Sequence, residues 1–143
     1  MDRVLRTLVL AVLVGAAAWA VLRWPHLDTV ETGRTPEYPE LQPRDYSASE
    51  AEVSRAVKAT LDRVGWSFVG SGRGPGGSAV QASTRGRVLP TDHEITIRIQ
   101  RLGARTRVSV AAHSRTFQWD FGENARLIEK FLPALDEEIG RRK

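Results

Sequence analysis

Residues 94–114 read EITIRIQRLGARTRVSVAAHS, and this stretch decides the fold. Apolar and polar residues alternate over 94–101 and again over 106–114, and the Leu-Gly-Ala between the two runs predicts a hairpin loop. Residues 78–87 alternate in the same way, and residues 66–71 add a short strand-like run. We therefore expect an antiparallel meander of about four strands, with one face in a core and the other in solvent.

An amphipathic helix is predicted before these strands, at about residues 50–64. Ser49 and Glu52 form a capping-box pattern, apolar residues then recur at helical spacing, and Gly65 supplies a C-cap. The chain should therefore enter the first strand directly from a helix that packs on the core face.

A second amphipathic helix is predicted after the strands. Asp120 and Glu123 form a D-x-x-E capping box before an apolar stripe over residues 121–139, and Pro133 would bend this helix or end its first half. The whole pattern predicts an α+β globular domain at residues 49–143, in which about four antiparallel strands are packed on one face by two helices.

The N-terminus is apolar without a break over residues 8–22. The longer stretch Val4 to Leu22, with Arg6 snorkelling, would give about 28 Å of helix against a bilayer core of about 30 Å. We therefore expect a transmembrane helix ahead of the domain, with residues 1–24 as an anchor or an uncleaved signal-like segment. A cleaved signal peptide ending at residues 18–20 is the alternative.

These expectations give the protein a place in the cell. It would be a single-pass protein of the cell membrane that contacts the bilayer through Val4 to Leu22. Its C-terminal domain would lie outside the cytoplasm, in the periplasm, because either interpretation of the N-terminus exports the rest of the chain.

Residues 25–48 are predicted to form an extended, proline-rich strap. Four prolines break any regular period and favour a polyproline-like conformation. Tyr38 and Leu41 are apolar and could dock on the domain, so we expect order at least from Thr35 to Leu41. The strap residues singled out are Thr35, Pro36, Tyr38 and Pro39.

Positive charge is concentrated on the predicted sheet, since eight Arg and only two acidic residues lie between Trp66 and Arg115. Guanidinium groups pair bidentately with phosphate and carboxylate, so the solvent face could bind an anionic lipid headgroup or an acidic envelope polymer. An ordinary solvated sheet face is the alternative. The candidate binding residues are Arg85, Arg98, Arg107, Arg115 and His113.

Residues 114–128 read SRTFQWDFGENARLI and form the corner between the last strand and the second helix. We expect Asp120 to cap the helix and to accept a hydrogen bond from Arg115. Asn124, one turn later, should bond the backbone of the strap near Thr35 or Tyr38. The predicted structural polar cluster is Ser114, Arg115, Asp120, Gly122 and Asn124.

This corner resembles a known family. SRTFQWDFGENARLIEKFLPALD is similar to the C-terminal signature of the domain of unknown function 1499 family, and ETGRTPEYPEL is similar to its N-terminal element. The sequence departs from the family at Phe117, in place of glycine, at Leu127, in place of a second arginine, and at residues 91–93, which keep an acidic pair only in part. The resemblance covers about residues 28–136 and implies no biochemical activity.

Three function classes remain open. The first is a membrane-anchored envelope domain that acts as a non-catalytic binding or interaction module through its Arg-rich sheet face. The second is an envelope hydrolase that uses His93 or His113 with Asp92, Asp120 or Ser114 as base and nucleophile, although no spacing matches a known catalytic motif. The third is a structural domain that docks another envelope protein on the strap or the sheet edge.

No metal, cofactor or nucleic acid is predicted as a partner. Alternation sends His93 to one face of its strand and Asp92 and Glu94 to the other, so the three cannot easily share an ion. The chain has no Cys, which excludes disulfides, thiolate metal sites and Cys nucleophiles. The arginines lack the interleaved aromatic residues typical of nucleic-acid binding.

Overall fold

The computed structural model describes residues 3–23, 27–87, 90–116 and 120–142. Nine elements follow one another in these ranges: α1 (Arg3–Arg23), β1 (Thr29–Glu31), β2 (Arg44–Tyr46), α2 (Glu50–Val64), β3 (Ser67–Gly74), β4 (Gly77–Arg85), β5 (Asp92–Leu102), β6 (Arg105–Ser114) and α3 (Glu123–Arg141).

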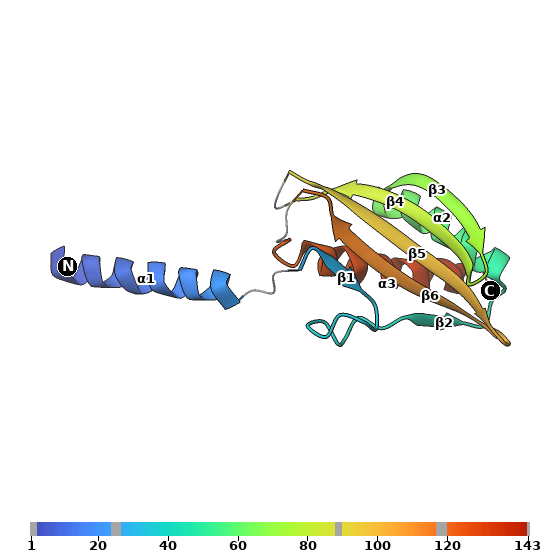
Figure 1. Ribbon diagram of the computed structural model, residues 1–143, viewed down its shortest axis with the longest axis horizontal. Coiled ribbons are helices and arrows are strands. Elements are labelled where there is room, and N and C mark those ends of the chain that lie inside the picture. The colour runs from blue at the N-terminus through green and yellow to red at the C-terminus, as the bar shows by residue number, and fades with distance from the viewer. Residues whose placement is uncertain (1–2, 24–26, 88–89, 117–119, 143) are drawn as a thin grey trace.

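The six strands form one antiparallel sheet in the order β1-β6-β5-β4-β3, and β2 pairs with another part of β6. Figure 1 shows α2 and α3 on one face of this sheet, and α1 projecting away from it. The opposite face has no helix of the described chain on it (Figure 1). The molecule therefore has one buried and one open sheet face.

The predicted fold class is wrong in its number of strands, because part of the strap belongs to the sheet. Val30 of β1 pairs with Ala112, and Asp45 of β2 pairs with Arg107, so both segments lie along β6. Each is three residues long, too short to show the alternation on which a strand prediction depends. The prolines at positions 36, 39 and 43 fall between the two segments, where the chain turns.

The predicted transmembrane anchor is also wrong. Within the described residues, no helix combines the length and the apolar character that a bilayer crossing requires. The unbroken apolar run at 8–22 has 15 residues, which is about 22 Å of helix against a hydrocarbon core of about 30 Å. The prediction of a single-pass membrane protein is therefore wrong, and the periplasmic placement that depended on it loses its basis. The predicted boundary between residues 24 and 25 lies outside the described residues.

The core lies between the sheet and the two packed helices. Trp66, directly after α2, stacks on Phe131 of α3 with ring centroids 5.4 Å apart. α3 continues through Pro133, so the proline does not end the helix. The largest fully buried apolar side chains include Val53, Val57 and Leu61 of α2, Ile95, Ile97 and Ile99 of β5, and Ile128, Phe131, Leu132 and Leu135 of α3.

Local signals predicted α2 correctly. The Ser49 hydroxyl accepts from the Glu52 backbone and the Glu52 carboxylate accepts from the Ser49 backbone, which confirms the capping box. Gly65 ends the helix with a φ of 77°, a left-handed conformation that favours glycine.

β5 and β6 form the central hairpin. Leu102 pairs with Arg105, so the loop is only Gly103 and Ala104, and the φ of 59° at Gly103 suits a tight hairpin turn. At the far end of the same hairpin the two strands diverge into loops, and their neighbouring residues face opposite sides of the sheet. Polar side chains lie on both faces of the sheet at this end of the hairpin, and the candidate site is located there.

Candidate functional site

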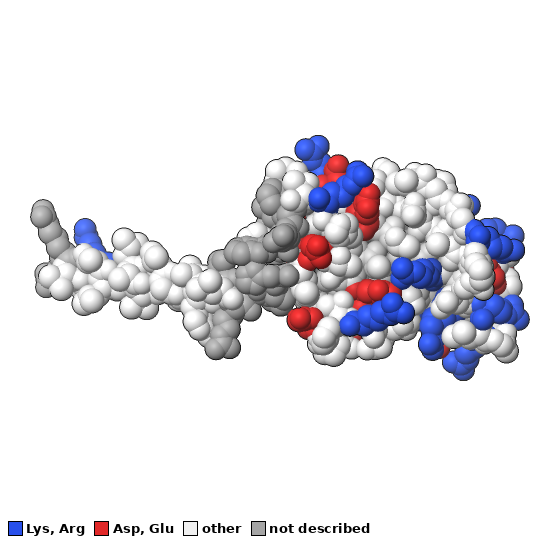
Figure 2. Space-filling view, viewed as in Figure 1, with Lys and Arg blue, Asp and Glu red and all other residues white. Residues whose placement is uncertain are grey.

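The arginines of the open sheet face are largely paired with carboxylates of the same chain. Arg98 lies 2.8 Å from Glu31 of β1, and Arg107 makes two hydrogen bonds to Asp45 of β2, at 2.7 and 2.8 Å. In Figure 2, which views this face, blue and red atoms lie side by side in several places, and blue atoms gather with little red at the right-hand end. The open face is therefore not the continuous cationic surface that composition indicated.

Sequence reasoning missed Glu31 and Asp45 because both lie in the strap. The hydrogen bond from Arg107 lowers the pKa of the Asp45 carboxyl, and the same contact raises the pKa of Arg107. Two of the candidate anion-binding residues, Arg98 and Arg107, thus already have an internal counter-ion.

His113 and Arg115, the remaining candidates near the end of β6, are also engaged. The Nδ1 atom of His113 lies 2.9 Å from the Thr29 hydroxyl. Arg115 forms an ion pair with Glu94 at 2.9 Å, and both side chains are more than half exposed. Arg85, at the end of β4, is exposed and takes part in none of the ion pairs found among the described residues.

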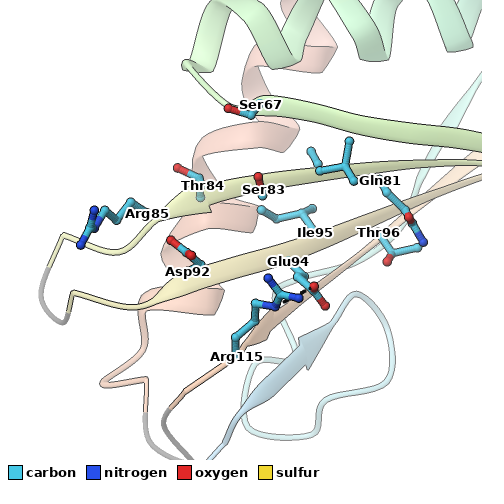
Figure 3. Close-up of a pocket in the computed structure, with 12 residues that line it drawn as sticks. Ser67, Gln81, Ser83, Thr84, Arg85, Asp92, Glu94, Ile95, Thr96 and Arg115 are labelled. Atoms are coloured by element: carbon cyan, nitrogen blue, oxygen red, sulfur yellow. Dashed lines mark ion pairs between the residues drawn. The ribbon is translucent and has the colours of Figure 1, made fainter.

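A hollow of about 480 Å³ lies on the open face where these strands end. Figure 3 shows Asp92 and the Glu94–Arg115 pair within it, and Arg85 reaching outward from the end of β4 at its rim. We call this surface the exposed hollow; its polar lining residues are Ser67, Gln81, Ser83, Thr84, Arg85, Asp92, Glu94, Thr96 and Arg115.

The other side of the same strand ends is a buried polar cluster. His93, Ser114 and Asn124 are each at most 2% exposed. The His93 Nδ1 atom lies 2.7 Å from the Asn124 side-chain oxygen, and the Asn124 amide donates to the Ser114 hydroxyl at 3.0 Å and to the Asp28 carbonyl at 2.9 Å. Because an amide oxygen only accepts, His93 must carry its proton on Nδ1. We call His93, Ser114, Asp120 and Asn124 the buried corner.

Asp120 holds the start of α3 in this corner. Its two carboxylate oxygens accept from the backbone N–H groups of Gly122, at 2.9 Å, and Asn124, at 2.7 Å. Phe121 and Gly122 have φ angles of 51° and 74°, so the chain makes its turn into the helix through two left-handed residues. Arg115, expected beside Asp120, instead pairs with Glu94 on the open face.

The strap residues are held by contacts within the strap and with the core. Thr35 accepts from the Glu31 backbone at 2.8 Å, the Pro39 carbonyl accepts from Gln42, and Pro36 is exposed. Tyr38 packs against the core, and this burial raises the pKa of its hydroxyl, with the nearby Asp120 charge as a smaller cause. Asn124 bonds the strap through Asp28 rather than through Thr35 or Tyr38.

Of the candidate hydrolase residues, the structure brings His93 and Ser114 together, with the Ser114 hydroxyl 3.3 Å from the His93 Nδ1 atom. His93 faces the core, whereas His113 and Asp92 belong to the open side, and both carboxylate oxygens of Asp120 are engaged by the backbone of α3. Within the described ranges, no three His, Cys, Asp or Glu side chains gather closely enough to hold a metal ion. The His93–Ser114 contact is buried, whereas the exposed side of the same strand ends can bind through hydrogen bonds and charge.

A family comparison agrees with the sequence of the corner and the strap. The sequence model described as Protein of unknown function (DUF1499) matches residues 20–135. The chain belongs to this family. The resemblance found in the sequence is thereby confirmed, and DUF1499 membership assigns no activity. No curated protein and no solved structure matches the chain. The function of this DUF1499 chain has to be argued from its geometry.

Proposed function

We propose that the protein is a non-catalytic binding domain that takes a polar, hydroxyl-bearing ligand with one acidic group in the exposed hollow. The supporting observation is the hollow itself, a space of about 480 Å³ on the open sheet face with a lining rich in hydroxyl, amide and carboxylate groups. Ligands bind in concave sites, where a small number of placed polar groups fix the orientation of the ligand.

The lining favours ligand hydroxyl groups over simple anions. Asp92 and the Glu94–Arg115 pair leave no net positive charge in the middle of the hollow, so a bare phosphate would meet carboxylates as well as guanidinium. A hydroxyl group both donates and accepts hydrogen bonds, and it can use the Asp92 carboxylate and the Gln81 amide equally. Sugar-like ligands have this chemistry.

Arg85 would give the hollow its preference for a ligand that carries an acidic group. Its exposed guanidinium at the rim is a fork of donors that matches a carboxylate or a phosphate on the ligand. An acidic sugar could therefore place its hydroxyl groups in the hollow and its anionic group on Arg85.

Titration calorimetry of the full chain with glucuronate, glucose and inorganic phosphate tests this function. Glucuronate should bind most tightly, because it alone offers both hydroxyl groups and a carboxylate. Arg85→Ala should weaken glucuronate binding by about tenfold, whereas the matched variant Arg55→Ala, on α2, should leave it unchanged. Binding that is unaffected by Arg85→Ala, or the absence of binding by all three probes, would overturn the proposal.

A further inference from the structure

The two edges of the sheet are treated differently by the fold. The edge at β6 is covered by β1 and β2. The edge at β3 has no strand beside it in the described chain, and all eight residues of β3 are exposed or half-exposed. An uncovered edge strand presents backbone N–H and C=O groups that can pair with another extended chain.

A groove runs beside this open edge. It lies between β3 and α2, has a volume of about 440 Å³, and includes Ser54, Arg55, Ser71 and Arg73 in its lining. At the start of β3, Phe68 and Val69 are 50% and 61% exposed. Large exposed apolar side chains on an open edge are typical of protein contact.

The charges around the groove are mainly positive. Arg55 and Arg73 line it, and the Lys58 ammonium lies 5.4 Å from the centre of the Phe68 ring. The acidic residue in the lining, Glu50, is already engaged by Arg73 at 3.1 Å and by the Ser78 hydroxyl at 2.8 Å. An incoming chain with carboxylates would therefore meet an attractive surface.

The same charges disfavour a second copy of this chain. If β3 paired with β3 of another copy, Arg55, Lys58 and Arg73 of both molecules would come to one interface. Like charges brought together at an interface repel each other and oppose association. The occupant that the charges fit is an acidic segment of a different protein.

We propose that an extended, acidic segment of another protein adds to the sheet as a strand along β3. Its backbone pairs with the open edge, its carboxylates face Arg55 and Lys58, and an apolar side chain rests on Phe68. Strand addition of this type obtains affinity from main-chain hydrogen bonds and specificity from alternate side chains. The site shares no charged residue with the exposed hollow.

Hydrogen exchange on the full chain tests this inference, with a short synthetic peptide that alternates glutamate and valine as the probe. The peptide should protect the backbone amides of residues 67–74. Its affinity should fall by about tenfold in the double variant Arg55→Ala/Lys58→Ala and remain unchanged in Arg85→Ala. Arg85 lines the exposed hollow and not the groove beside β3. A loss of glucuronate binding in Arg85→Ala and a loss of peptide binding in the double variant therefore test the two proposals separately.

Three results would overturn the inference. The first is equal binding of a matched peptide in which lysine replaces glutamate, since the groove would then not select charge. The second is an absence of added protection in β3 at saturating peptide. The third is protection of β3 without peptide that rises with protein concentration, because the edge would then belong to a second copy of the chain.

Discussion

The buried corner and the exposed hollow are built from neighbouring residues on the same strands, yet they differ in every physical respect. His93 is 1% exposed and hydrogen-bonded within the core, whereas Asp92 and Glu94 on either side of it line the hollow. Ser114 and Arg115 divide in the same way at the end of β6. The direction in which a polar side chain faces, and not its place in a motif, decides whether it lies in the buried corner or lines the proposed ligand site.

The two regions should respond oppositely to mutation. Within the described chain, every buried side-chain nitrogen or oxygen atom has a hydrogen-bond partner, so removing a member of the corner leaves other groups buried without one. Groups in the hollow can be hydrated when a neighbour is lost. Changes in the corner should therefore reduce stability, and changes in the hollow should alter binding.

The largest effect is expected at Asn124. Asn124→Ala removes the hydrogen bonds to His93, Ser114 and the Asp28 carbonyl and leaves these groups buried. We expect the free energy of unfolding to fall by about 3 kcal/mol. Urea unfolding, followed by tryptophan fluorescence, measures this loss.

Gln42→Ala is the matched control for that variant. The Gln42 amide also donates to a backbone carbonyl, that of Pro39 at 2.8 Å, but it does so in solvent. Its loss should cost less than about 0.5 kcal/mol. If Gln42→Ala and Asn124→Ala proved equally costly, burial would not be what distinguishes the corner.

A smaller effect is expected at Asp120. Asp120→Ala removes the acceptor for two backbone N–H groups at the start of α3 and should cost about 1 kcal/mol. Asp120→Asn keeps one side-chain oxygen and should cost less. Thermal unfolding by circular dichroism separates the three proteins, and an unchanged melting temperature in Asp120→Ala would show that the carboxylate does not hold this helix.

The smallest effect on stability is expected on the open face, at Arg107. The hydrogen bond from Arg107 lowers the pKa of Asp45, so the pair stabilises the fold above the ordinary pKa of an aspartate. That contribution is lost as the pH falls through the lowered pKa. Arg107→Ala should therefore destabilise less than Asp120→Ala at pH 7, because exposed ion pairs are weak.

Unfolding of Arg107→Ala should be compared with the wild type at neutral pH and at successively lower pH. The difference in unfolding free energy should shrink as Asp45 becomes protonated in the folded state. Arg85→Ala is the control, since Arg85 belongs to no ion pair in the described chain and its removal should give no such trend. If the difference in unfolding free energy between wild type and Arg107→Ala grew as the pH fell, a group other than Asp45 would account for the pH dependence.

The parts of the fold that depend on local signals were predictable. Alternation located the central hairpin, and the Ser49–Glu52 and Gly65 signals located α2. β1 and β2 were not predictable, because a segment of three residues is too short to show an alternation of apolar and polar residues. They are strands because each pairs with β6. The N-terminal run was predicted to cross a membrane from its apolar residues, and no helix of the described residues meets that requirement.

The candidate site was predictable only in its chemistry. The D-x-x-E pattern was correct in part. Asp120 does accept from the backbone at the start of α3, but the N-cap position is Gly122, so the predicted capping box is wrong. The partners of Arg98 and Arg107 could not be found without knowing that the strap pairs with β6. The Glu94–Arg115 pair did have a signal. Glu94 lies opposite His113 in the hairpin, so Arg115, two residues on, is a diagonal neighbour of Glu94 on the same face.

The central claim is that ligands meet the exposed hollow while the buried corner only supports it. The most direct test is an NMR titration of the isotope-labelled full chain with glucuronate, in the wild type and in Arg85→Ala. We expect amide shifts at Ser83, Asp92 and Thr96 in the wild type, strongly reduced in Arg85→Ala, with little change at Asn124. Shifts that centred on Asn124 and Asp120, or that persisted in full in Arg85→Ala, would contradict the claim and make the corner the functional site.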